Sequence, residues 1–94
     1  MESKKDLTNK LIEFAQKHPL ITSIANSSDK NDKASYYFLI TPPYDYDLVN
    51  EIKKFNLDLI NECYKCNLFH YPNSVNIYEF SFIGEVFWDS RHNV

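Results

Sequence analysis

One stretch near the end of the chain restricts the fold more than any other. Residues 76–88 read Asn-Ile-Tyr-Glu-Phe-Ser-Phe-Ile-Gly-Glu-Val-Phe-Trp. Side chains of a β-strand point alternately to opposite faces, so an unbroken strand here gathers its even-numbered apolar residues on one face. These residues are Tyr78, Phe80, Phe82, Val86 and Trp88. A face this apolar has to be covered, and the rest of the chain must supply the covering layer.

Two earlier stretches have the periodicity of amphipathic helices and can supply that layer. Residues 3–17 carry one apolar stripe, and Pro19 ends the helix that this stripe predicts. The stripe consists of Leu7, Leu11, Phe14 and Ala15. A second helix is predicted to begin at an N-cap formed by Asp45 or Asp47 and to continue to about Tyr64. Its apolar residues step by four, three, four and four positions: Leu48, Ile52, Phe55, Leu59 and Cys63.

The remaining apolar segments predict strands. Residues 20–25 and 35–41 should pair as an antiparallel hairpin across the polar loop 26–33, and apolar groups on both faces of 20–25 place it centrally in the sheet. Residues 67–71 form a third strand and lead through a turn at 72–74 into a strand that begins near Val75. Gly84 is expected to mark a bulge that divides this run into 75–83 and 85–89. An alternative makes part of 76–83 helical.

The predicted element order is helix, strand, strand, helix, strand, strand. This order indicates one α+β domain over residues 1–94, in which an antiparallel sheet of four to five strands carries two helices on one face.

Composition excludes several classes of function. The net charge is -3, and residues 67–88 contain no Lys or Arg, which argues against binding to nucleic acid. A single Gly rules out a glycine-rich phosphate-binding loop. The N-terminal residues lack the apolar core of a signal peptide, no run approaches a membrane span, and two Cys fit a reducing compartment, so we expect a cytoplasmic protein. Frequent Asn, Lys, Ile and Tyr suggest a bacterial or phage genome.

Two groups of residues could carry chemistry. Cys63 and Cys66 form a C-x-x-C pair, and with His70 they offer three ligands where a structural zinc ion needs four. The simpler interpretation is that Cys63 completes the buried helix stripe and that no metal is bound. Asp45 and Asp47 could bind a divalent cation, but capping of the second helix explains them better. We therefore expect no cofactor and no catalytic residue.

The surplus of aromatic residues points to binding instead. Aromatic residues make up 16% of the chain, and exposed ones are enriched at protein interfaces. Those expected to remain uncovered by two short helices are Tyr36, Tyr44, Tyr46, Tyr78, Phe87 and Trp88. The sequence thus predicts a small, acidic, non-catalytic interaction module (an inhibitor, adaptor or small subunit) that binds a protein partner or forms a homodimer through its C-terminal strand.

Two alternatives stay open. One is a small ligand-binding or degenerate phosphoryl-transfer domain that uses Asp45 and Asp47. The other is a phage-encoded inhibitor of a host defence enzyme, which the small size and the acidity of the chain would fit.

Overall fold

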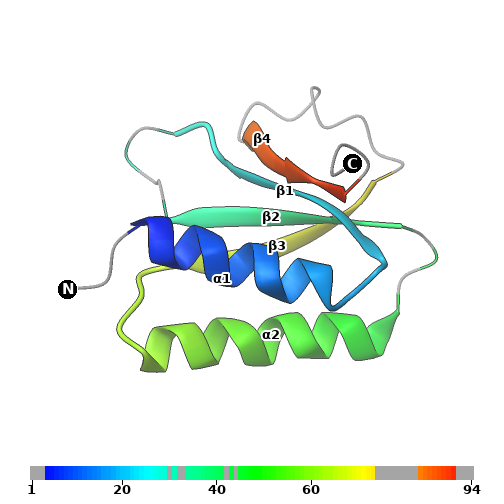
Figure 1. The fold of residues 1–94 in the computed structure, drawn as a ribbon, viewed down its shortest axis with the longest axis horizontal. Coiled ribbons are helices and arrows are strands. Elements are labelled where there is room, and N and C mark those ends of the chain that lie inside the picture. Colours follow the sequence, from blue (N-terminus) through cyan, green and yellow to red (C-terminus); the bar gives the residue numbers. More distant parts are fainter. Residues whose placement is uncertain are drawn as a thin grey trace.

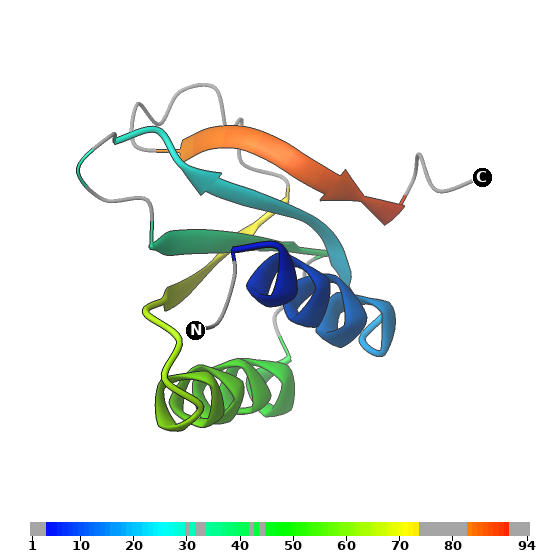
Figure 2. The same cartoon turned by 60° about the vertical axis from the view of Figure 1, so that its left-hand side comes forward.

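Two helices lie side by side on one face of a four-stranded β-sheet in the computed structural model of the chain (Figure 1). The structure describes residues 4–29, 31, 34–41, 43, 45–73 and 83–90. Its elements in chain order are α1 (Lys4–Gln16), β1 (Ile21–Ser27), β2 (Ser35–Ile40), α2 (Tyr46–Asn61), β3 (Asn67–Pro72) and β4 (Ile83–Asp89). Figure 2 shows the two layers from a second direction, with both helices on the same side of the sheet. The predicted α+β class and the two-helix cover are therefore confirmed.

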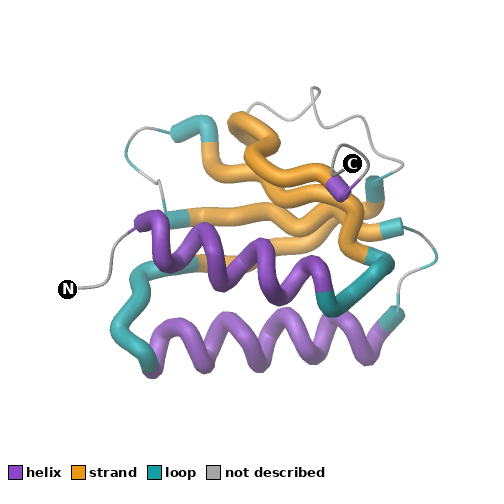
Figure 3. Tube along the Cα trace, viewed as in Figure 1, coloured by secondary structure: helices purple, strands orange, loops and turns teal. Residues whose placement is uncertain are grey.

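The sheet is mixed, and the prediction of an antiparallel sheet is wrong for one strand pair. The strand order is β3-β2-β1-β4, in which β1 pairs antiparallel with β2 and β4 but β2 pairs parallel with β3. Helix α2 connects β2 to β3 and packs against the sheet, so the chain re-enters the sheet in the direction of β2. In this strand order, β3 and β4 lie at opposite edges of the sheet (Figure 3).

Several predicted elements agree with the structure, and one lies outside it. The helix predicted at 3–17 is α1, and the strand predicted at 20–25 is β1, which is indeed central in the sheet. Neither of the two described helices has the length and apolarity that a membrane span requires. The strand predicted at 75–83, its helical alternative and its hairpin with 67–71 fall outside the described residues except for Ile83.

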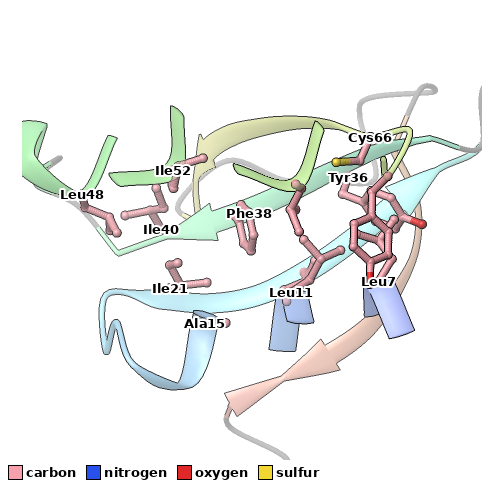
Figure 4. Close-up of a cluster of buried hydrophobic side chains, with 13 residues drawn as sticks. Leu7, Leu11, Ala15, Ile21, Tyr36, Phe38, Ile40, Leu48, Ile52 and Cys66 are labelled. Atoms are coloured by element: carbon pink, nitrogen blue, oxygen red, sulfur yellow. The ribbon is translucent and has the colours of Figure 1, made fainter. Parts of the chain in front are cut away.

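The main core fills the space between the helices and the sheet (Figure 4). All six residues of β2 are buried, because this central strand has a neighbour on each side and both of its faces are covered. The even-numbered β2 residues Tyr36, Phe38 and Ile40 face the helices. The helices contribute Leu7, Leu11, Ala15, Leu48, Ile52 and Leu59. The predicted apolar stripes of both helices therefore point into this core, with Phe14 and Phe55 half-buried at its border.

Bulges in two strands change which residues share a face. Thr22 is an extra residue in β1, so Ile21 and Ile24 both reach the main core. In β4, Phe87 is an extra residue between Val86 and Trp88. Val86 packs with the second cluster (Ala25, Tyr37 and Ile83), whereas Phe87 and Trp88 pack against the main core. The prediction that Val86 and Trp88 share one face is wrong for this reason.

Gly84 lies at a second irregularity of β4, as predicted. Ala25 pairs with Val86 and Ser27 with Ile83, so three steps along β4 lie opposite two steps along β1. A Cβ atom at Gly84 would lie 2.9 Å from the carbonyl oxygen of Asn26 and 2.9 Å from the carbonyl carbon of Ser27. Glycine is required here by close approach to the β1 backbone, and it permits the bulge.

Both ends of α2 are capped. Asp45 Oδ1 accepts a hydrogen bond of 2.9 Å from the Asp47 N–H, which makes Asp45 the N-cap. At the other end, the N–H groups of Cys63 and Tyr64 donate to the carbonyls of Ile60 and Leu59, each at 3.0 Å. This pattern is a Schellman motif, and Cys63 occupies its left-handed position with φ 71°. The turn points the Cys63 side chain to solvent, so the prediction that Cys63 is buried in the helix stripe is wrong, and Cys66 is the buried cysteine.

Candidate functional site

The structure places the predicted aromatic interaction residues in very different surroundings. Tyr36 is only 2% exposed and meets the ring of Phe87 edge to face at 6.1 Å, so its predicted place on an exposed surface is wrong. Burial, with a smaller contribution from the Cys66 thiol, raises the pKa of the Tyr36 phenol. Phe87 and Trp88 are half-buried against the main core. Tyr44 and Tyr78 lie outside the described residues.

Tyr46 is the predicted residue that is clearly exposed, at 81%, and it begins a stripe along the outer face of α2. Leu57 is 62% exposed and Ile60 is 49% exposed on the same stripe. The full stripe steps by four, three, four and three positions through exposed residues: Tyr46, Asn50, Lys53, Leu57 and Ile60. We call these five residues the outer stripe. They lie opposite the buried residues of α2, because positions at this spacing fall on one side of a helix.

One flank of the outer stripe borders a groove between the helices. The groove has a volume of about 300 Å³. Glu51, Lys54 and Asp58 line it from α2, Lys10 and Glu13 line it from α1, and Lys17 lines it from the turn after α1. Phe14 and Phe55 also line the groove and stack with ring centroids 4.3 Å apart and planes at 3°. The stacked Phe14 and Phe55 rings thus connect the two helices at this groove, and three basic and three acidic side chains surround them.

The same rim carries an ion pair at the C-terminal end of α2. Lys10 Nζ lies 3.6 Å from Glu62 Oε1, with both side chains substantially exposed, and 5.9 Å from the centroid of the Tyr64 ring. An exposed pair of this kind adds little to stability, although it helps to orient the end of α2 beside α1.

The other flank of the outer stripe is tied to the edge strand β3 by Asn56. The side-chain amide of Asn56 donates to the Cys66 carbonyl at 3.0 Å and accepts from the Leu68 N–H at 3.1 Å. The Cys66 sulfur lies 3.7 Å from the same amide nitrogen, and burial raises the pKa of this thiol. Asn56 therefore pairs with the edge of β3 in the way that a neighbouring strand would.

Both edges of the sheet carry features that hinder pairing with a further strand. In the parallel ladder between β2 and β3, the Asn67 N–H donates to the Ala34 carbonyl, so the odd-numbered residues of β3 bond to β2. The backbone groups of the even-numbered residues therefore point away from β2, toward the open edge of the sheet. At Leu68 the outward N–H already bonds Asn56, and Pro72 has no N–H. At the other edge, the two bulges of β4 interrupt its ladder.

The sheet face away from the helices offers a smaller apolar surface. Phe69 is 43% exposed and stacks on Tyr37 with centroids 5.3 Å apart. Tyr71 also packs on Tyr37, at 5.9 Å. Among the described residues, this surface presents one large exposed ring, whereas α2 presents three large exposed side chains.

The residues predicted as a possible metal or catalytic site do not assemble into one. Among the described residues, no three His, Cys, Asp or Glu side chains are placed to hold a metal ion together. Cys63 is exposed at the end of α2, Cys66 is buried, and His70 belongs to β3. Burial, together with the charge of Lys53, lowers the pKa of His70. Asp45 serves as the N-cap of α2, and Asp47 lies in its first turn.

Sequence reasoning missed Leu57 and Ile60, because the buried stripe of α2 was the stronger pattern. Their spacing from Tyr46 was nevertheless visible as a second, outward stripe.

No protein-family model, curated protein or solved structure matches this chain.

Proposed function

We propose that this chain is a non-catalytic protein–protein interaction module that docks its partner through the outer stripe of α2. Such a module would act as an inhibitor, an adaptor or a small subunit. The observation that supports the proposal is the gathering of Tyr46, Leu57 and Ile60 on one exposed helix face. Large apolar side chains grouped in this way are typical of an interface.

The surroundings of the stripe favour this surface over the others. Asn56 anchors α2 to β3, and Leu48, Ile52 and Leu59 bury the opposite side of the helix. The stripe is consequently held on a rigid element, which limits the conformational entropy that binding would cost. Neither sheet edge offers a comparable uninterrupted surface among the described residues.

The test is a comparison of matched variants against an identified partner. The tagged chain is expressed in its host, the co-purifying protein is identified, and the complex is rebuilt from the two purified proteins. We expect Leu57→Ser with Ile60→Ser to weaken binding by at least about a hundredfold, as loss of two central apolar contacts would. The control is Leu20→Ser, which changes a Leu that is 36% exposed outside α2.

Equal binding by the α2 double variant and the Leu20 variant would contradict the proposal. Both variants should keep the circular dichroism spectrum and the Tm of the parent chain, because the changed side chains lie at the surface. A partner that binds the parent and the double variant alike would have to use another surface.

A homodimer through the C-terminal strand is a second proposal. Strand β4 is an edge strand, as such pairing requires, but its two bulges leave fewer regular positions for a ladder. Light scattering on the purified chain tests it, and a monomer at all accessible concentrations would exclude it. Phe87 and Trp88 also pack against the core, so substitutions there need a parallel measurement of Tm.

The phosphoryl-transfer alternative has weaker support. One carboxylate oxygen of Asp45 already accepts the Asp47 N–H, and the side chains of Asp45 and Asp47 are both exposed. Calorimetry with Mg²⁺ and a nucleotide tests this alternative, since a functional site would give saturable binding that Asp47→Asn reduces.

A further inference from the structure

We infer that residues 74–82 cross the sheet on the face away from the helices and cover the apolar side chains there. These residues join β3 to β4 and lie outside the described residues. The covered surface is separate from the outer stripe, so the inference does not depend on the proposed function. Its support is the burial of that face, the directions of the strands and the length of the connection.

The face away from the helices is buried, although both helices lie on the other face (Figure 2). Ala25, Tyr37 and Leu39 are each at most 6% exposed. Tyr37 and Leu39 alternate along β2 with the residues that face the helices, so their side chains point the opposite way. A sheet face open to water leaves its central side chains accessible from above, even where neighbouring strands shield their sides. A further layer of chain is therefore required on this face.

The strand directions require a crossover between β3 and β4. Strand β2 is parallel to β3, and β1 is antiparallel to both β2 and β4, so β3 and β4 run in the same direction. The chain leaves β3 beside Ile40 and enters β4 beside Ser27, at the opposite end and the opposite edge of the sheet. Residues 74–82 therefore have to return along the sheet and also pass from one edge to the other.

The hand of crossover connections assigns this crossing to the face away from the helices. Connections between parallel strands of one sheet are right-handed in nearly all proteins. The connection through α2 steps from β2 outward to β3, whereas residues 74–82 step from β3 back across the sheet. Two crossovers that step in opposite directions have the same hand only when they use opposite faces. Since α2 lies on the helix face, residues 74–82 belong on the other face.

The length of the connection fits a direct crossing. Three strand spacings and the five residue steps from Ser35 to Ile40 separate its two ends by roughly 22 Å. The chain from Asn73 to Ile83 reaches about 33 Å when extended, which leaves enough length to pass above the side chains. A hairpin that first ran back along the outer edge of β3 would leave too few residues to span the remaining distance of roughly 19 Å to β4.

The described residues at both ends of the connection are directed onto the sheet. The Asn73 N–H donates to the Ile40 carbonyl at 2.8 Å. The side-chain amide of Asn73 donates to the hydroxyl groups of Thr41 and Thr22, each at 3.3 Å. Thr22 belongs to β1, two strands away from β3, so the exit from β3 is tied inward across the end of β2. At the entry to β4, Ile83 packs in the second cluster.

The composition of residues 74–82 suits a cover for an apolar face. The segment has one charged residue, Glu79, and no Lys or Arg. Five of its nine residues are apolar: Val75, Ile77, Tyr78, Phe80 and Phe82. These side chains can remove Tyr37 and Leu39 from water, which the two strand neighbours of β2 cannot do alone.

Nuclear Overhauser effects in the full-length chain test the inference. We expect the methyl groups of Ala25 and Leu39 to give cross-peaks to side chains of residues 74–82. The methyl groups of Leu11 and Ile52, which are buried on the helix face, are the control and should give none. Cross-peaks from the control methyl groups in place of those from Ala25 and Leu39 would overturn the inference.

Two further results of this measurement would also overturn it. If Ala25 and Leu39 show no cross-peaks to residues 74–82, the face is left open to a partner protein. If a mixture of isotope-labelled and unlabelled chains shows these cross-peaks only between the two kinds of chain, a second copy supplies the cover.

A pair of matched variants gives a second readout. Ile77→Ser with Phe80→Ser should lower the Tm by at least about 4 °C, because apolar contacts with the sheet are lost. Leu57→Ser with Ile60→Ser is the control, since it makes the same kind of change at exposed residues of α2 and should leave the Tm unchanged. An unchanged Tm in the first variant would contradict the inference. If that variant does not fold, the cross-peaks of the parent chain decide.

Discussion

Cys63 occupies a backbone conformation that its side chain disfavours. Its φ of 71° lies in the left-handed region, where a Cβ atom crowds the following carbonyl and where glycine is the usual residue. The Schellman bonds from Cys63 and Tyr64 hold it there, and Tyr64 packs into the main core beside Leu59. Tertiary packing therefore stabilises a turn that the residue at its tightest position opposes.

Replacing Cys63 with glycine should stabilise the protein. We expect Cys63→Gly to raise the free energy of unfolding by about 1 kcal/mol, because the strain of the left-handed conformation disappears. Urea denaturation followed by circular dichroism measures the change. Cys63→Ala is the control, since it removes the thiol but keeps the Cβ atom. A gain from alanine equal to that from glycine would show that the thiol and not the backbone is responsible.

His70 makes folding depend on pH. Burial, and then the charge of Lys53, lowers the pKa of His70 in the folded chain below its ordinary value of about 6.5. The unfolded chain therefore binds a proton at this residue more readily than the folded chain does. The stabilising contribution is fully present above the ordinary histidine pKa and is lost as the pH falls through the lowered value.

His70→Gln should weaken this pH dependence. We expect the free energy of unfolding of the parent chain to decline more than that of the variant as the pH falls from about 8 to about 5. Urea titrations of both proteins across this range provide the comparison. Parallel profiles would mean that His70 has the same pKa in the folded and unfolded chains.

At the scale of elements, Asn56 explains how α2 keeps its place against the sheet. One side-chain amide satisfies the Cys66 carbonyl and the Leu68 N–H, two backbone groups at the start of the edge strand. The buried residues of α2 hold the helix against the sheet. The bonds from Asn56 are directional, so they add a fixed attachment between α2 and the start of β3.

Asn56→Ala should loosen this attachment. Loss of both bonds at a partly buried site should lower the free energy of unfolding by about 1–3 kcal/mol. Asn50→Ala is the matched control, because Asn50 lies exposed on the outer face of the same helix and should change stability by less than about 0.5 kcal/mol. Hydrogen exchange at Leu68 should also accelerate in Asn56→Ala, and unchanged exchange there would contradict the role assigned to Asn56.

At the scale of the whole molecule, β2 joins the two layers. It is buried along its full length, and Phe38 at its centre is fully buried and lies 5.8 Å from the ring of Phe14 in α1. Both helices and the neighbouring strands therefore depend on the same side chains. The outer stripe, by contrast, contributes surface and no core.

This division between core and surface predicts unequal effects of two similar truncations. Phe38→Ala should lower the free energy of unfolding by about 3–5 kcal/mol, a large part of the stability of a small domain. Leu57→Ala should change it by less than about 0.5 kcal/mol, because Leu57 is mostly exposed. Thermal unfolding followed by circular dichroism measures both. A large loss in Leu57→Ala would place that residue in the core and remove it from the docking surface.

Periodicity was enough to predict the helices, the central hairpin and the α+β class. A repeat of three to four residues defines the buried stripe of α2. Side chains of β2 alternate between its two faces without interruption, because the extra residue of its ladder with β1 lies in β1 and its ladder with β3 is regular. A cap formed by Asp45 or Asp47 could also be predicted, since capping depends on neighbours in the chain, and the structure assigns it to Asp45. The exposure of Tyr46 was also predicted, whereas Leu57 and Ile60 were overlooked beside the stronger buried stripe.

The local sequence thus determined which segments are helical or extended and which sides of the helices are apolar. Only the tertiary structure decided that β3 runs parallel to β2, that bulges at Thr22 and Phe87 exchange the faces of their strands, and that Cys66 is buried in place of Cys63. Helix and strand periods depend on residues a few positions apart. Strand direction, bulges and the burial of one particular cysteine depend on contacts between distant segments, and a one-residue shift reverses every side chain beyond it.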